Sequence, residues 1–386
     1  MLKLIKGGKV YNPKDLGKKD ILIAGSKILK VADHIDPPAG LDTEIIDASG
    51  MNVIPGIIDG HVHILGAGGT VGPNSRNSML HLSTIARAGV TTLIGVVGVE
   101  SLGNTMKDLY IRARALEMDG ITTYTYSGSF ELPVPTITGD ILEDLCLIDK
   151  VIGIKIAIND AMSCHPTKKD LKEIISKTRR GGKFGAKAGV VDCHLGEAPG
   201  TLMFVVELLE EMGLPKEMFV ATHVNRCPEV FEYSIEAGLK GLSLDLTGNV
   251  SNEEMIPASQ ALRMLLDSGV PMSQITFSSD ANTPFEYKDY KGTSPISVCA
   301  KELKKMVEEN GFTLTEALQP LTTNPAARYK LENAKGSLDA GKDADVVLLD
   351  KNLQVSTVIA RGAVLLQDGV PLARGRYEDV MRKSLE

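Results

Sequence analysis

Eight short, continuously apolar runs, separated by longer amphipathic stretches, constrain the fold of this chain more than any other feature. The first run lies within residues 53–63, and the other seven end near residues 98, 128, 158, 196, 225, 246 and 281. Strands that helices bury on both faces are continuously apolar rather than alternating. Eight such units favour a closed (β/α)8 TIM-like barrel. A doubly wound open sheet is the alternative, but no GxGxxG fingerprint follows a strand, so we rank it below the barrel.

Sequence of a different character flanks the barrel pattern at both ends. Residues 1–55 contain short β-rich pieces separated by Gly, Pro, Asp and Asn, and β-rich pieces return in residues 330–386. Because chain termini often lie close together in a compact unit, we expect these two segments to form one small β-sandwich domain. Residues 56–329 then form the barrel. The final stretch, 376–386, predicts a short exposed helix.

The overall charge and the distribution of apolar residues exclude several classes of partner. The 386 residues carry a formal net charge of −7, which argues against a nucleic-acid surface. No stretch approaches the roughly 18 apolar residues of a membrane span, and the first residues lack the apolar region and cleavage site of a signal peptide. We therefore expect a cytoplasmic protein that acts on a small molecule and has neither a nucleic-acid nor a membrane partner.

Ionisable residues stand at the carboxyl ends of the apolar runs, where a barrel carries its active site. His61 and His63 are two residues apart, so both side chains lie on one face of a strand and can bind one metal ion. His194, His223 and Asp280 each close a later run. A single histidine of this kind is usually hydrogen-bonded structure, and an Asp after Ser is often a helix N-cap. Five such residues at corresponding strand ends favour a metal site.

Lys155 stands inside the apolar run VIGIKIAI. An unpaired buried ammonium costs several kcal/mol, so this lysine must be paired, have a lowered pKa or be chemically modified. Pairing with Asp160, or extension of the side chain to solvent, is one interpretation. The other is that the neutral amine captures carbon dioxide, which gives a carbamate anion able to bridge two metal ions.

The segment Pro55-Gly56-Ile57-Ile58-Asp59-Gly60-His61-Val62-His63 resembles the PGxxDxHxH signature of the amidohydrolase superfamily. The resemblance spans nearly the whole chain and is strongest to the isoaspartyl (β-aspartyl) dipeptidase family, through the following segments: HVHILGAGGTVGP, ARAGVTTLIGVVG, PTITGD, VIGIKIAI, THVNR and SSDAN. It implies a hydrolase that cleaves an amide bond in a dipeptide or another small amide.

The resemblance also implies a role for each candidate ligand. His61 and His63 would bind the more buried of two divalent metal ions, and His194 and His223 the outer one. Lys155, as its carbamate, would bridge the two ions. Asp280 would bind the buried metal, accept a proton from the bridging hydroxide and deliver it to the leaving amine. Zinc is the first expectation for nitrogen and oxygen ligands without thiolates, although iron or manganese would also fit.

Several substrate-binding positions depart from the dipeptidase pattern. Thr70 replaces a glutamate that binds the substrate amino group, Phe130 replaces a tyrosine that contacts the scissile carbonyl, and Met162 replaces an arginine that binds substrate carboxylate. The family's serine after SSDxN has no clear counterpart, and Thr283 and Pro284 lie nearest to it.

Arg226 and Asn225 of THVNR are retained. Arg226 could bind a carboxylate, or it could be a solvated surface arginine. The three replacements are all toward less polar side chains, so we hypothesise a substrate without a free α-amino group, such as an N-substituted amino acid. The alternatives are a cyclic amidase resembling hydantoinases and dihydroorotases, and a noncatalytic scaffold that kept the barrel. Barrels of this family tend to form homo-oligomers, which we also expect here.

Overall fold

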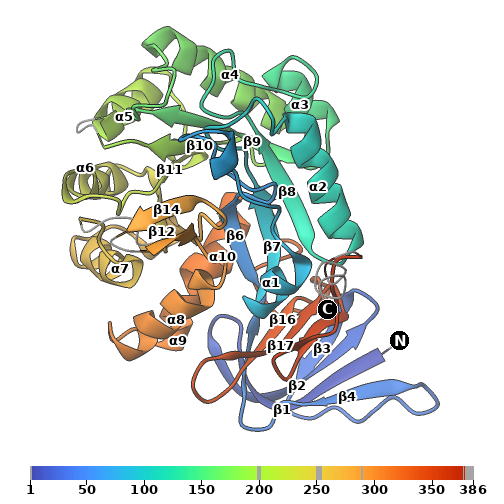
Figure 1. Ribbon diagram of the computed structural model, residues 1–386. Helices are drawn as coiled ribbons and strands as arrows, with labels where there is room; N and C mark the ends of the chain where they lie inside the picture. Colours follow the sequence, from blue (N-terminus) through green and yellow to red (C-terminus); the bar gives the residue numbers. More distant parts are fainter. Residues whose placement is uncertain (1, 198–200, 249–253, 288–289, 377, 379–386) are drawn as a thin grey trace.

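The computed structural model describes residues 2–197, 201–248, 254–287, 290–376 and 378. Most of the predicted helix over 376–386 therefore lies outside the described residues. Within the described residues, the elements form a barrel of parallel strands and helices together with a separate sheet built from both ends of the chain (Figure 1). No described helix is long and apolar enough to cross a membrane.

The predicted barrel is confirmed. Eight parallel strands pair in sequence order from β6 to β13. The sheet nearly closes on itself, because Val62 forms a parallel bridge with Ala281 and the His63 amide donates to the Ala281 carbonyl at 3.0 Å. The strands are β6 (Ile57–Val62), β7 (Val90–Gly95), β8 (Thr122–Ser127), β9 (Val151–Ile158), β10 (Val190–Leu195), β11 (Phe219–Thr222), β12 (Ser243–Thr247) and β13 (Ile275–Ser278).

Helices cover the outer face of the barrel, as the continuously apolar strands require (Figure 1). Every residue of β9 and β10 is buried. The α-helices are α1 (Leu82–Arg87), α2 (Met106–Met118), α3 (Ile141–Leu147), α4 (Lys168–Phe184), α5 (Thr201–Glu211), α6 (Pro228–Leu239), α7 (Ala258–Asp267), α8 (Val298–Glu308), α9 (Leu314–Leu318) and α10 (Thr323–Arg328). Short 3-10 turns also occur, at Pro73–Ser75, Lys216–Met218, Met272–Gln274 and Gln319–Leu321.

The second sheet joins the two ends of the chain, in agreement with a small sandwich domain. Its order is β19-β18-β17-β16-β5-β1-β2-β3, with β4 beside β1, and it is mostly antiparallel. Its strands are β1 (Leu2–Tyr11), β2 (Asp15–Ala24), β3 (Lys27–Ala32), β4 (Thr43–Asp47), β5 (Asn52–Pro55), β16 (Val346–Leu349), β17 (Val355–Ala360), β18 (Ala363–Gln367) and β19 (Val370–Pro371). Its own apolar core includes Ile5, Ile21 and Val346. The domain boundaries at 55 and 330 stay a prediction.

A buried lysine connects this terminal sheet to the barrel. Lys335 is 4% exposed, and its ammonium contacts Asp345 at 2.6 Å, Asp343 at 2.8 Å and the Thr122 hydroxyl at 2.7 Å. Asp345 directly precedes β16, whereas Thr122 begins the barrel strand β8. The three contacts therefore neutralise the charge and fix one part of the fold against the other.

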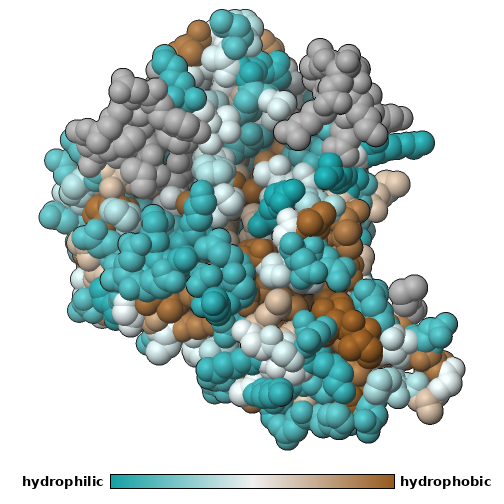
Figure 2. All heavy atoms as spheres, turned by 60° about the horizontal axis from the view of Figure 1, so that its bottom comes forward, coloured by the Kyte–Doolittle hydropathy of each residue, from teal (hydrophilic) through white to brown (hydrophobic). Residues whose placement is uncertain are grey.

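Hydrophilic side chains cover much of the face that Figure 2 presents, but hydrophobic side chains gather in part of it. Large apolar residues that lie partly in solvent include Leu29 and Ile45 of the terminal sheet and Leu41 just before β4, which are 57%, 49% and 61% exposed. Exposed apolar surface of this kind is often covered in a subunit contact. The homo-oligomer nevertheless stays a prediction.

Candidate metal centre

The structure brings the six predicted ligands together at the carboxyl ends of the barrel strands. His61 lies in β6, with His63 just after it, and Lys155 and His194 lie in β9 and β10. His223 and Asp280 follow β11 and β13. All six residues are at most 8% exposed. His223 and Asp280 have φ angles of 66° and 49°, in the left-handed region that non-glycine residues rarely adopt, so the chain turns sharply at both positions.

His61, His63 and Asp280 form the tightest part of the cluster. One potential ligand atom of each residue lies within 4.8 Å of those of the other two. Asp280 Oδ1 is 3.2 Å from His63 Nε2 and 3.8 Å from His61 Nε2. Two imidazole nitrogens and a carboxylate oxygen that converge in this way are a donor set suited to zinc or a similar divalent ion.

Polar groups behind the rings hold two of the histidines in place. Asp192 Oδ2 lies 2.9 Å from His61 Nδ1, and the Thr247 hydroxyl lies 2.6 Å from His223 Nδ1. Each contact occupies Nδ1 and leaves Nε2 for the centre of the cluster. A carboxylate or hydroxyl behind a histidine is the usual support for a metal ligand. The residues therefore fit a metal ion both by donor type and by orientation.

His194 is oriented by Asp160 rather than by a strand neighbour. Asp160 Oδ2 is 2.9 Å from His194 Nε2. This contact lowers the pKa of the Asp160 carboxyl to about 2, although partial burial opposes the shift. Asp160 and Arg226 both contact Nε2, so Nδ1 is the nitrogen of His194 left for a metal ion. Arg226 Nη1 lies 3.0 Å from the same His194 nitrogen and donates to the Leu195 carbonyl at 3.2 Å.

Lys155 does not pair with Asp160, which was one of the two interpretations of the sequence. Its Nζ lies 3.1 Å from His61 Nε2 and 5.6 Å from the centroid of the Phe130 ring. Burial lowers the pKa of the Lys155 ammonium to about 8, although Asp192 and Asp280 oppose the shift. β9 and the segment after β8 approach each other so closely here that a Cβ on Gly128 would lie 2.1 Å from the Lys155 carbonyl oxygen. Only glycine fits at this position. The amine is buried against the histidine cluster, and no carboxylate of the described residues forms an ion pair with it.

Burial also sets the charge of the other members of the cluster. It lowers the pKa of the His63 imidazole to about 4 and that of His194 to about 3. Burial alone would raise the pKa of Asp280, but the imidazoles of His223, His63 and His61 hold it well below its usual value. Neutral imidazoles and an ionised carboxylate are the protonation states that bind metal ions.

A cavity of about 130 Å³ opens onto this cluster. His63, Lys155, His194 and Asp280 contribute to its wall. The substrate-position candidates Thr70, Phe130, Arg226 and Thr283 line it too, with Val99 and Pro284 among the apolar members. The Thr283 hydroxyl donates to Asp280 Oδ1 at 2.8 Å, so it supports the carboxylate as well as lining the cavity.

Two of the predicted substrate-binding residues lie outside this cavity. Met162 is 54% exposed and does not line it. Asn225 is fully buried, and its amide spans the Thr247 and Ile256 backbone through contacts of 2.8 to 3.0 Å. That amide fixes the loop after β11, and the role of both residues in substrate binding stays a prediction.

The sequence did not lead us to assign Asp192, Thr247 or Asp160 a role in supporting the histidines. Asp192 stands two positions before His194 on a buried strand. Side chains two residues apart on a strand lie on the same face, so this spacing could have revealed Asp192 as a neighbour of the ligands. Thr247 and Asp160 carry no comparable signal, because they meet His223 and His194 only through the arrangement of different strands and loops.

The sequence model of the Amidohydrolase family matches residues 52–365, most of the chain. Two crystal structures of β-aspartyl dipeptidase from Fervidobacterium islandicum AW-1 superpose with a TM-score of 0.89 and are 34% and 35% identical in sequence. Each match covers 96% of this chain and 98% of the enzyme, and one structure contains the dipeptide β-Asp-Leu.

Sequence relatives with other activities are more distant. A dihydroorotase from Lactobacillus johnsonii is 25% identical over 403 aligned residues, which cover 91% of this chain and 89% of that enzyme. An adenine deaminase from Methanococcoides burtonii is 23% identical, and the aligned part spans 55% of its length. The names of these three relatives refer to three different substrates: a β-aspartyl dipeptide, dihydroorotate and adenine.

Proposed function

Because the chain belongs to the amidohydrolase family and is a hydrolase of carbon–nitrogen bonds, we propose that it cleaves a small amide with two divalent metal ions, most simply zinc. The convergence of His61 Nε2, His63 Nε2 and Asp280 Oδ1, two of whose residues line the cavity, carries this proposal. His61, His63 and Asp280 would hold one ion, and His194 and His223 the other. When bound, such a pair of ions lowers the pKa of a water molecule and polarises the amide carbonyl.

Lys155 would join the two sets of ligands after it reacts with carbon dioxide. The lone pair of its neutral amine attacks the carbon atom, an N–C bond forms, and one proton leaves to solvent. The product is a carbamate that keeps the lysine nitrogen and offers two carboxylate oxygen atoms to the metal ions. A pKa of about 8 makes the neutral amine far more abundant near neutral pH than it is for an ordinary lysine.

Asp280 is the residue that we assign to proton transfer. Its carboxylate is ionised and lines the cavity, so it accepts the proton that the attacking water loses. It then passes this proton to the leaving nitrogen, which departs as a neutral amine. The Thr283 hydroxyl holds the same carboxylate oxygen at 2.8 Å and keeps it directed toward the cavity.

The cavity wall supports an anionic substrate without a free amino group. Arg226 supplies a positive charge at the wall, suited to a substrate carboxylate. Thr70 and Phe130, which line the same cavity, offer no charge to a substrate ammonium. We therefore propose an N-substituted β-aspartyl or related amide, a change from the dipeptide found in the Fervidobacterium enzyme.

Kinetics on paired substrates test this proposal. We expect kcat/KM for N-acetyl-β-Asp-Leu to exceed that for β-Asp-Leu by at least tenfold, since an uncompensated ammonium in the cavity loses about one charge-assisted hydrogen bond, roughly 1.5–3 kcal/mol. Asp280→Asn should lower kcat about 10²–10⁴-fold on whichever substrate is turned over. A preference for the free amine would reject the proposed change of substrate.

A cyclic amide is the second candidate, and the dihydroorotase from Lactobacillus johnsonii is the observation that favours it. The ring nitrogen of a cyclic amide carries no positive charge, which also suits Thr70 and Phe130. Hydrolysis of dihydroorotate at a rate above that of N-acetyl-β-Asp-Leu would select this second candidate. No hydrolysis of dihydroorotate would remove it.

A further inference from the structure

A second cavity, of about 270 Å³, lies at the opposite end of the barrel from the metal centre. Gly189 and Val190 at the start of β10 line it, and so does Met218, which directly precedes β11. The candidate ligands His194 and His223 stand at or beyond the other ends of these strands. This cavity therefore takes no part in the proposed hydrolysis.

Four cations from two separate parts of the chain line this cavity. Arg179 and Lys183 lie one turn apart on α4, whereas Arg328 ends α10 and Lys330 follows it. Glu217 is the single carboxylate among the lining residues. Four positive charges and one negative charge leave a net charge of +3 in a chain whose formal net charge is −7. The lining of the cavity is thus positively charged, although the chain as a whole is negatively charged.

Within the described residues, none of these cations forms a close ion pair, although Glu217 lies near enough to act electrostatically on Arg328. Arg328 donates to the Glu217 carbonyl at 2.6 Å and Lys330 to the Lys187 carbonyl at 2.8 Å, so both are bound by backbone oxygens that carry no net charge. Among the residues that the structure describes, no carboxylate oxygen lies within 4.0 Å of any of the four cations. In addition, Arg328 Nε is buried without a hydrogen-bond partner. Like charges gathered in this way are unfavourable unless an anion joins them.

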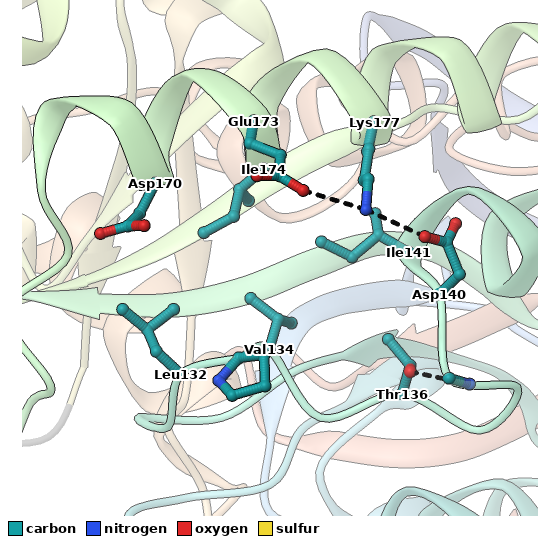
Figure 3. A pocket seen from close by; sticks show the side chains of 11 residues that line it. Leu132, Val134, Thr136, Asp140, Ile141, Asp170, Glu173, Ile174 and Lys177 are labelled. Carbon is teal, nitrogen blue, oxygen red and sulfur yellow. Dashed lines mark hydrogen bonds and ion pairs between the residues drawn. The ribbon is translucent and has the colours of Figure 1, made fainter.

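Another cavity on the same helix provides a contrast. It has a volume of about 370 Å³ and lies between α4 and the segment after β8 (Figure 3). There Lys177 lies 3.0 Å from Asp140 and 3.1 Å from Glu173, so its charge is already neutralised (Figure 3). Of these two cavities, only the one lined by Arg179, Lys183, Arg328 and Lys330, the basic cavity, has positive charge that no close carboxylate of the described residues neutralises.

We propose that the basic cavity binds a small phosphomonoester. The phosphate group supplies close to two negative charges and three acceptor oxygens, which match two guanidinium groups and two ammonium groups. The apolar lining from Val190, Pro215 and Met218 would cover the carbon part of the ligand. A concave site in a chain of net charge −7 selects a small anion over a nucleic acid, which the rest of the surface would repel. This site is independent of the proposed hydrolysis.

Titration calorimetry on the full-length, metal-loaded protein tests the proposal, with glucose 6-phosphate, inorganic phosphate and glucose as probes at fixed ionic strength. We expect saturable binding of glucose 6-phosphate and none of glucose. The double variant Arg179→Gln/Lys183→Gln should weaken binding at least tenfold. Lys330→Gln should also weaken glucose 6-phosphate binding. Because Lys330 is exposed and lies on another segment, this variant tests the site even if the double variant misfolds.

The matched control removes the same charge from the same helix. Lys169 and Arg180 lie on α4 and are exposed, but neither lines the cavity, so Lys169→Gln/Arg180→Gln should bind within about twofold of wild type. The proposal would be overturned if both double variants lost binding equally or if Arg179→Gln/Lys183→Gln bound as tightly as wild type. It would also be overturned if wild type bound neither phosphate probe. Inorganic phosphate that binds as tightly as glucose 6-phosphate would support the anion site and identify free phosphate as its ligand.

Discussion

Asp192 holds the His61 ring from the side opposite the metal-facing nitrogen, through the 2.9 Å contact with Nδ1. Asp192→Asn replaces this anionic acceptor by an amide that no longer selects the required tautomer. We expect the metal affinity to fall about 10–100-fold, as for other supporting residues of metal ligands. Competition with a chromogenic chelator measures the change.

Asp245→Asn is the control for this prediction. It makes the same substitution at another buried barrel carboxylate, which contacts the hydroxyls of Thr222, Thr276 and Ser278 and no histidine. Its metal affinity should match that of wild type. If both variants lost affinity equally, the effect would come from a disturbed barrel and not from the orientation of His61.

At the residue scale, the candidate ligands other than Lys155 could be selected from the sequence because each stands at the end of an apolar run, where a barrel concentrates its chemistry. Lys155 was predictable from the cost of burying an amine, and burial is indeed nearly complete, at 1% exposure. Asp160 was expected as a possible partner of Lys155 but orients His194 instead. Such pairings depend on loop geometry, which the pattern of apolar residues does not encode.

At the scale of elements, Asp245 connects three neighbouring strands of the barrel. Its carboxylate on β12 accepts from Thr222 on β11 and from Thr276 and Ser278 on β13. Burial raises the pKa of Asp245 to about 6, although these hydroxyls oppose the shift. Between pH 4 and 6 the folded state therefore keeps a proton that the unfolded state has lost.

The contribution of this one group to stability should consequently fall by about 3 kcal/mol as the pH rises through this window. Asp245→Asn removes the titration, so the free energy of unfolding of the variant should rise by about that amount relative to that of wild type between pH 4 and pH 6. Denaturant unfolding at several pH values in this range measures both slopes. Parallel slopes for the variant and wild type would show that Asp245 does not titrate there.

The eight barrel strands were predictable as elements because continuous burial leaves a continuous apolar run. The antiparallel pair β14 (Pro284–Tyr287) and β15 (Tyr290–Thr293) was not predicted. It lies between β13 and α8, where the barrel pattern suggests only a loop, and a pair of four-residue strands is too short for a clear alternation. The order of the nine terminal strands was equally out of reach, since β5 pairs with the distant β16.

At the scale of the whole molecule, Lys335 ties the barrel to the terminal sheet. Lys335→Met would leave the buried carboxylate of Asp345 and the partly buried one of Asp343 without their shared cation. Breaking a buried ion pair in this way costs about 3–5 kcal/mol, so we expect a loss of that size in the free energy of unfolding. Urea unfolding followed by circular dichroism measures it.

Lys27→Met provides the comparison, because Lys27 also contacts Asp343, at 2.8 Å, but its side chain is 51% exposed. An exposed pair of this kind contributes roughly 0–1 kcal/mol. Similar losses in the two variants would mean that burial of Lys335 adds nothing to the connection between the two parts of the molecule.

The number of divalent metal ions per chain tests the central claim most directly. Wild-type protein and Lys155→Ala would be reconstituted with zinc and bicarbonate, and bound metal would be counted by inductively coupled plasma mass spectrometry alongside the rate of amide hydrolysis. We predict two ions per chain and activity in wild type, and at most one ion and no activity in the variant. Two ions retained without Lys155, or a wild type that hydrolyses amides with one ion or none, would contradict the account.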